Sequence, residues 1–138
     1  MLAATIRARV TSVCVAAGFS ATDNPFDFRE QPTGGIDLAL RVTTNGGEVL
    51  GGIAFTEERT DIFEIWVARK QGADPEAAYQ ALLADAAVLR AAVIRDGATG
   101  GGDYAVPDAG AAHDIQHDPG AEYAVLRLAL PINYEVTL

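Results

Sequence analysis

Two histidines and three aspartates lie within one short stretch of the chain. They are His113, His117, Asp108, Asp114 and Asp118. Imidazole nitrogens and carboxylate oxygens bind divalent cations, and on a helix the four-residue histidine spacing would place both rings on one face. Gly110 precedes the histidines and Pro119 follows them, without the apolar packing that orients metal ligands. We therefore expect a solvated loop and no metal site.

Other reactive residue types occur without the partners that their chemistry needs. Cys14 stands on an apolar stripe without nearby positive charge, which indicates a buried thiol rather than a reactive thiolate. The glycines at 100–102 lack the Lys-Ser/Thr pair of a phosphate-binding loop. Glycoside cleavage uses a pair of carboxylates as acid and base. Four carboxylates near a predicted turn and strand could supply such a pair, namely Glu57, Glu58, Asp61 and Glu64. Charged hairpin turns are common, so we predict no catalytic residue, no cofactor and no enzymatic activity.

Composition and charge bound the class of the protein. Its 138 residues with 49% hydrophobic content suit one folded domain, 1–138. Ten Lys and Arg residues against 19 Asp and Glu residues give a net charge of −9, which repels phosphate and anionic lipids. No apolar run approaches the roughly 20 residues of a membrane span, and no secretory signal is recognisable. We expect a soluble protein made in the cytoplasm.

Hydrophobic periodicity predicts two helices and four strands. The helices are expected over residues 2–17 and 74–95, and the strands over residues 36–43, 49–56, 61–70 and 126–136. Asn45-Gly46-Gly47 supplies residues that tolerate positive φ, which predicts a tight hairpin turn there. Glu57-Glu58-Arg59 is expected to form the next turn. Asp74-Pro75-Glu76 is typical of a helix start, and Gly97 of a helix end.

Much of the negative charge falls in one glycine-rich stretch. Residues 96–122 contain six acids and no Lys or Arg, which leaves 13 acids against 10 bases elsewhere. Such a composition predicts a flexible acidic excursion from the fold. The whole pattern indicates an α+β domain: an antiparallel sheet, made of a three-stranded meander plus a long C-terminal strand, with two helices packed on one face.

The third predicted strand is apolar on both faces. Ile62 and Trp66 point to one side, and Phe63, Ile65 and Val67 to the other. A subunit interface would use this surplus. A strand buried on both faces within one subunit is the alternative, and periodicity does not separate the two.

The predicted elements resemble those of a known family. The resemblance lies in the order of the elements, the Asn45-Gly46 hairpin, the helix from Asp74 and the alternating strand of residues 126–136. They are similar to the tail terminator and tail-completion proteins of long-tailed phages and phage-like particles such as gene transfer agents. The resemblance covers nearly the whole chain and includes no short motif, so it assigns no residue a role.

The resemblance implies a structural subunit of the virion tail or neck. It implies a homo-oligomer, a hexameric ring, that ends the tail tube and joins it to the head-connector or stopper protein, while DNA passes through an acidic lumen without specific binding. The expected oligomer interface comprises Ile62, Trp66, Phe55 and Arg69. The expected partner-docking loop comprises Asp103, Tyr104, Asp108, His113 and His117.

Two alternatives accompany this hypothesis. The subunit could belong to another ring of the neck or to head completion, because those proteins are also small ring-formers of mixed fold. It could instead be a small α+β domain that binds a compact ligand, with His113 or Tyr134 supplying polar contact. A hydrolase has only scattered carboxylates in its favour and ranks last.

Overall fold

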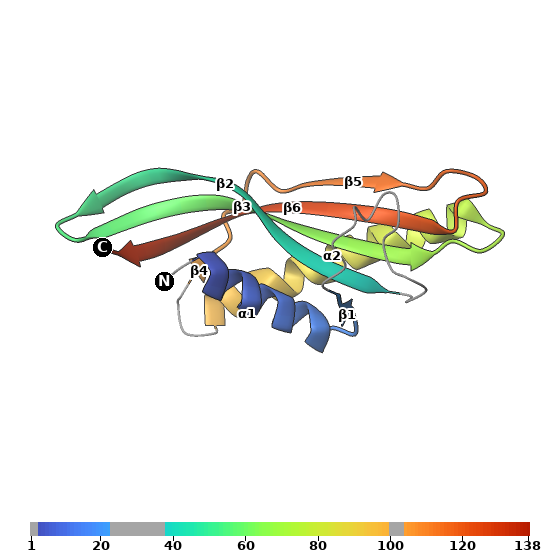
Figure 1. Cartoon of the computed structure of the whole chain (residues 1–138), viewed down its shortest axis with the longest axis horizontal. Helices are drawn as coiled ribbons and strands as arrows, with labels where there is room; N and C mark the ends of the chain where they lie inside the picture. Colours follow the sequence, from blue (N-terminus) through green and yellow to red (C-terminus); the bar gives the residue numbers. More distant parts are fainter. Residues whose placement is uncertain (1–2, 23–37, 100–103) are drawn as a thin grey trace.

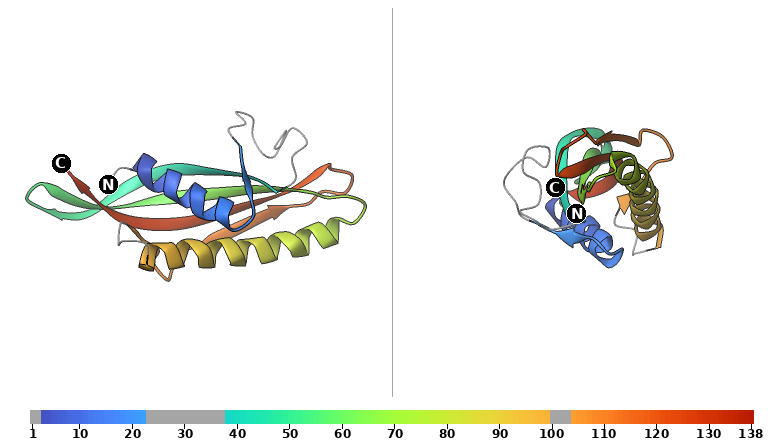
Figure 2. Two further views of the ribbon diagram at one scale, coloured as in Figure 1. Left: turned by 90° about the horizontal axis from the view of Figure 1, so that it is seen from below. Right: turned by 90° about the vertical axis from the view of Figure 1, so that its right-hand side faces the viewer.

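The computed structural model describes residues 3–22, 38–99 and 104–138. These form one sheet of six strands whose one face is covered by two helices (Figures 1 and 2). The elements are α1 (Ala3–Ala16), β1 (Ser20–Ala21), β2 (Ala39–Ile53), β3 (Thr56–Lys70), α2 (Pro75–Thr99), β4 (Tyr104–Ala105), β5 (Ala112–Gln116) and β6 (Tyr123–Thr137). The predicted α+β class with two helices on one face is confirmed.

Three long strands form the centre of the sheet. The strand order is β1-β2-β3-β6-β4, and β5 also pairs with β6. Only β1 runs parallel to its neighbour, while all other pairings are antiparallel. β2, β3 and β6 are each 15 residues long, and all three extend past the helices at one end (Figure 1).

The turns of the predicted three-stranded meander do not lie where the sequence predicted them. Residues 39–53 form one continuous strand, and the hairpin turns at Ala54 and Phe55, where Ile53 pairs with Thr56. Gly46, with φ +66°, sits at a shift of register inside β2, so it forms a bulge instead of a turn. A second shift lies between Val49 and Gly51. The predicted turn at residues 57–59 is part of β3.

The core lies between the sheet and the helices. On β6 the even-numbered apolar residues face the helices, as their alternation predicts, and Leu126, Leu130 and Ile132 are fully buried. Phe63, Ile65 and Val67 of β3 join the same core. The helices contribute Ile6, Val10, Cys14, Leu82, Leu89 and Val93. Cys14 is fully buried, which confirms its expected place in the core, and this burial raises the pKa of its thiol to about 12.

α2 has the predicted start but not the predicted end. Asp74 Oδ1 accepts hydrogen bonds from the backbone N–H groups of Glu76 and Ala77, at 3.1 and 3.2 Å, which confirms the predicted start. The predicted end at Gly97 is wrong, because the helix continues to Thr99. A Cβ at position 97 would lie 2.9 Å from Cε2 of Tyr104. Glycine is needed here for close packing rather than for a helix cap.

The described residues of the stretch 96–122 lie closer to the sheet than their composition predicts. Strands β4 and β5 both fall in this stretch and pair with β6, at residues 133–134 and 125–129 respectively. Pro131 pairs with Ile62 of β3 on one side of β6, and on the other side it lies between the β4 and β5 pairings, where no partner strand requires its missing N–H. Backbone pairing to a long central strand thus overrides the polar composition.

No segment was expected to be long and apolar enough to span a membrane. This expectation is wrong for α2, which meets that test by length and composition. An 18-residue stretch of this helix has a mean hydropathy of 1.4. The value comes from the Leu, Val and Ile residues of the helix together with its alanines, and the core helix of a folded protein can pass the same test. Here Leu82 and Leu89 are buried against the sheet, and Asp85 pairs with Arg69 of β3.

Candidate functional site

The most exposed apolar surface lies on a three-stranded projection that we call the arm. It comprises residues 48–60 of the β2–β3 hairpin and residues 135–138 at the end of β6, and it extends beyond both helices (Figures 1 and 2). No arm residue is buried. The backbone N–H of Leu138 donates to the carbonyl of Phe55, which fastens the chain end to the hairpin turn.

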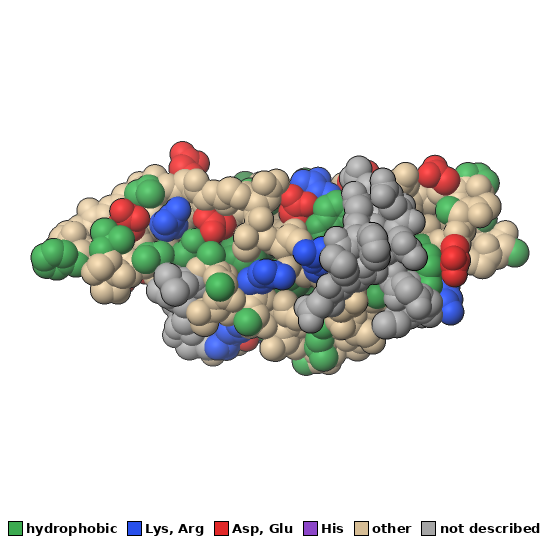
Figure 3. Space-filling model, viewed as in Figure 1, with side chains coloured by type: hydrophobic (Ala, Val, Ile, Leu, Met, Phe, Trp, Pro, Cys, Tyr) green, Lys and Arg blue, Asp and Glu red, His purple; other side chains and the backbone are tan. Residues whose placement is uncertain are grey.

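Five of the seven exposed large hydrophobic residues in the described part of the chain belong to the arm. These five are Val49, Leu50, Ile53, Phe55 and Leu138, with exposed fractions of 53, 51, 84, 75 and 68%. Figure 3 shows hydrophobic side chains over the arm, at the left of the molecule. Large apolar side chains left in water are costly, so a projection that exposes several of them is typical of an interaction site. Of these five residues, only Phe55 was predicted from the sequence to belong to an interface.

The sheet face opposite the helices holds a second group of predicted interface residues. Ile62 and Trp66 are both partly exposed there. The indole Nε1 of Trp66 donates to Thr43 Oγ1 at 3.3 Å, and the Arg127 guanidinium carbon lies 6.0 Å from the centre of its ring. Trp66 therefore forms a fixed, half-buried platform on this face.

Glu64, also on this face, is only 6% exposed and links three strands. Its two carboxylate oxygens accept hydrogen bonds from Asn45 on β2, at 2.9 Å, and from Arg127 on β6, at 2.6 Å. The bond to Glu64 raises the pKa of the Arg127 guanidinium. Pairing of this buried carboxylate explains why a charged residue is tolerated between Ile62 and Trp66.

The structure does not bring the four predicted interface residues together. Arg69 lies on the helix-facing side of β3, where its guanidinium binds both oxygens of Asp85 at 3.0 and 3.1 Å. Ile62 and Trp66 occupy the other face, and Phe55 lies at the tip of the arm. The alternation of β3 already places odd-numbered Arg69 with the core residues, so this difference was available in the sequence.

The residues of the predicted docking loop also lie in different surroundings. Asp103 lies outside the described residues. Tyr104 is 4% exposed, and its hydroxyl donates within the core, 2.6 Å from Asp96 Oδ2 and 3.2 Å from the Val93 carbonyl oxygen. It is an anchor rather than a docking residue. The ring of His117 packs at 4.7 Å from that of Tyr79.

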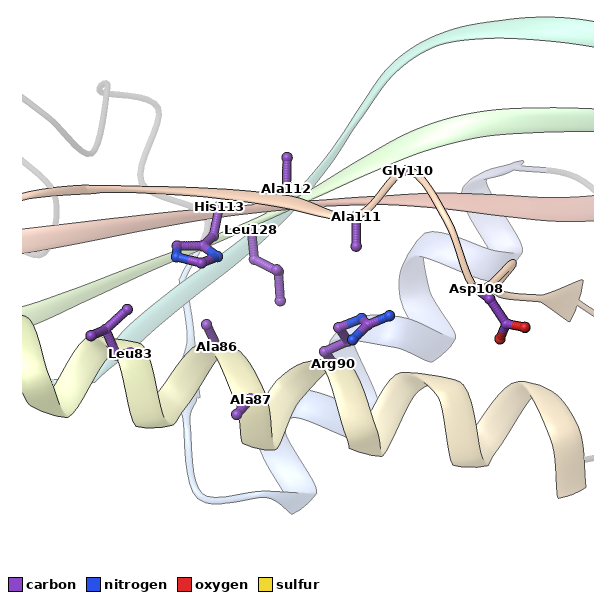
Figure 4. A pocket seen from close by; sticks show the side chains of 10 residues that line it. All are labelled: Leu83, Ala86, Ala87, Arg90, Asp108, Gly110, Ala111, Ala112, His113 and Leu128. Atoms are coloured by element: carbon purple, nitrogen blue, oxygen red, sulfur yellow. The ribbon is translucent and has the colours of Figure 1, made fainter.

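The other two loop residues, Asp108 and His113, line a cleft between α2 and β5 (Figure 4). Its volume is about 320 Å³. Leu83, Ala86 and Ala87 of α2 form one wall, and His113 points toward them from β5 (Figure 4). Arg90 also lines the cleft, and its Nε is buried without a hydrogen-bond partner among the described residues.

The residues considered for catalysis and metal binding do not converge. In the described part of the chain no group of three His, Cys, Asp or Glu side chains could hold a metal ion. Asp61 and Glu64 point to opposite faces of β3, so they form no pair of acid and base. Asp61 Oδ2 instead accepts a 2.7 Å hydrogen bond from the buried Tyr134 hydroxyl. Glu57 and Glu58 lie on the arm.

No protein-family model matches this sequence, and no curated protein matches it either.

Proposed function

We propose that this protein is a structural subunit that assembles into a ring at the end of a phage or phage-like tail tube. The observation that carries the proposal is the arm, which exposes five large hydrophobic side chains beyond the helical layer. An enzyme needs convergent polar groups in a closed site, whereas an assembly subunit needs apolar surface that only a neighbour covers. The described surface fits the second requirement better.

The charge of the chain supports the same function. A net charge of −9 at pH 7 would give a ring of such chains a negative potential as a whole. Phosphate backbones do not adhere to such a lumen, so DNA could pass without being held. The partners in this proposal are other copies of the chain, the tail tube protein and the head-connector protein. The location is the virion, at the tail or neck.

The test is the assembly state of the purified chain, alone and mixed with its tail tube protein. Mass measurement and electron microscopy are expected to show a hexameric ring that caps the tube. A strict monomer that neither binds nor caps tubes would refute the proposal. A ring that binds the head connector but not the tube would assign the subunit to the neck or to head completion.

The second candidate function is binding of a small ligand in the cleft between α2 and β5. The observation in its favour is that Arg90 and His113 both line a hollow of about 320 Å³ (Figure 4). Thermal unfolding with metals and metabolites, with and without chelator, tests it. A rise in Tm that disappears in His113→Ala would favour the cleft over ring assembly.

A further inference from the structure

The arm carries acidic as well as apolar side chains, and the strand register places three acids on one of its faces. Glu58 lies opposite Glu135 of β6, and Glu48 lies opposite Thr60, two residues from Glu58 along β3. Because side chains alternate along a strand, Glu48, Glu58 and Glu135 share the face opposite the helices. Ile53, which pairs with Thr56, is on this face too. The arm has four acids and one base, Arg59.

This charge argues against contact between two arms. Like charges brought together in an interface cost several kcal/mol, so an arm should seek apolar surface with positive charge around it. Outside the arm, the exposed large hydrophobic residues of the described chain are Val15 on α1 and Val88 on α2.

α1 provides the complementary surface. It contains no acid, and of its two basic residues Arg9 is ion-paired with Asp96 of α2, so Arg7 is the basic residue that it offers to a partner. Arg7, Thr11 and Val15 follow one another at intervals of four and therefore lie along one side of the helix, which we call the α1 flank. Arg7 is exposed, and its Nε donates to the carbonyl of Val42 on β2 at 2.7 Å. That bond fixes the side chain beside the sheet edge.

We infer that the acidic, apolar arm of one subunit docks on the α1 flank of a second copy of this chain. This inference rests on the proposed function and specifies the contact between subunits that would hold the ring together. The arm lies at one end of the molecule and α1 beside its body (Figure 1). A contact between two different surfaces repeats head to tail, and it closes into a ring when the rotation between copies allows.

The experiment uses charge reversal in the full chain. Variant one carries Glu48→Lys and Glu58→Lys on the arm, and variant two carries Arg7→Glu on the flank. Each alone would bring like charges together, so self-association measured by sedimentation is expected to weaken by about tenfold or more. A mixture of the two is expected to associate again, because each arm then meets a flank of opposite charge. Arg95→Glu, an exposed basic residue on α2, is the matched control.

A second pair of variants avoids the hydrogen bond that Arg7→Glu removes. Ile53→Cys on the arm and Thr11→Cys on the flank are expected to form an intersubunit disulfide in a mixture of the two proteins. The native Cys14 is fully buried and does not interfere. Rings that persist in both charge variants, or a mixture that stays dissociated and forms no disulfide, would overturn this docking inference. Persistent rings would leave the proposed function standing, whereas an unaltered chain that is always monomeric would remove both.

Discussion

Arg9 of α1 and Asp96 of α2 join the two helices through a two-point ion pair across 87 residues of chain. Arg9 Nε donates to Oδ2 at 2.8 Å and Nη2 donates to Oδ1 at 3.0 Å. The Tyr104 hydroxyl donates to the same Oδ2. One carboxylate therefore ties α1, α2 and β4 together at the end of the helical layer nearest the arm.

Asp96→Asn is expected to lower the free energy of unfolding by about 1–3 kcal/mol at pH 7, because it leaves partly buried donors without a charged acceptor. The hydrogen bond from Arg9 is the main reason that the pKa of Asp96 is lowered. A lowered pKa gives stability that is complete above the ordinary carboxyl value of about 3.9 and is lost as the pH falls through the folded value. The difference between the two proteins should therefore close below about pH 4.

Urea unfolding at a series of pH values measures this difference, and Asp108→Asn, in an exposed loop, is the control. A difference that does not depend on pH would show that the ion pair contributes nothing to stability.

Gly97→Ala is expected to destabilise the protein by about 1–3 kcal/mol, because the added methyl group would press on the ring of Tyr104. At an open helix position the same change stabilises by up to about 1 kcal/mol. The sign of the effect, measured by thermal or urea unfolding, thus separates packing from helix propensity. In a Tyr104→Ala background Gly97→Ala should destabilise less, because the ring is gone and the backbone carbonyl oxygen of residue 104, 3.0 Å from the added Cβ, is the close contact that stays. A stabilising effect in the unaltered background would contradict the close contact.

Tyr134→Phe is expected to change the alkaline behaviour of the protein. Burial, followed by the hydrogen bond to Asp61, raises the pKa of Tyr134 to about 12. A raised pKa gives stability that is present below the ordinary tyrosine value of about 10 and is lost as the pH rises toward the folded value. The variant should lose less stability than the unaltered protein over that interval.

Absorbance of tyrosinate at alkaline pH, followed together with circular dichroism, measures this change. The late part of the tyrosine titration should be smaller in the variant, and Tyr79→Phe is the matched loss of one hydroxyl. If the absorbance lost in Tyr134→Phe came from the early part of the titration instead of the late part, the Tyr134 hydroxyl would not be held in the core.

Local signals predicted the elements whose causes are local. The alternation of β6 follows from its one buried face, and the start of α2 follows from Asp74 and the nearest backbone amides. Both could therefore be predicted from the sequence. The hairpin was misplaced because positive φ at Gly46 suits a bulge as well as a turn. The true turn at Ala54 and Phe55 has no turn-type sequence, and the pairing of two 15-residue strands determines it.

The candidate interaction surface was harder to predict. Residues 49–56 have the composition of a core strand, and only the three-dimensional placement of the helices reveals that Val49, Leu50 and Ile53 each stay more than half exposed. Gly97 raised a similar difficulty, since a glycine near a helix end serves either as a cap or as a close contact. The partner of such a glycine, here Tyr104, is visible only once the chain is folded.

Trp66→Ala is expected to weaken ring assembly more than it unfolds the subunit. Trp66 lies on the sheet face opposite the helices, continuous with the acidic face of the arm, and is only partly buried. Its removal should cost about 1–2 kcal/mol of unfolding free energy, whereas Phe63→Ala, in the core on the other face of β3, should cost about 3–5 kcal/mol. Chemical denaturation and size-exclusion chromatography of both variants measure the two effects. If Trp66→Ala lost stability and assembly in the same proportion as Phe63→Ala, Trp66 would be a core residue and this face would have no part in assembly.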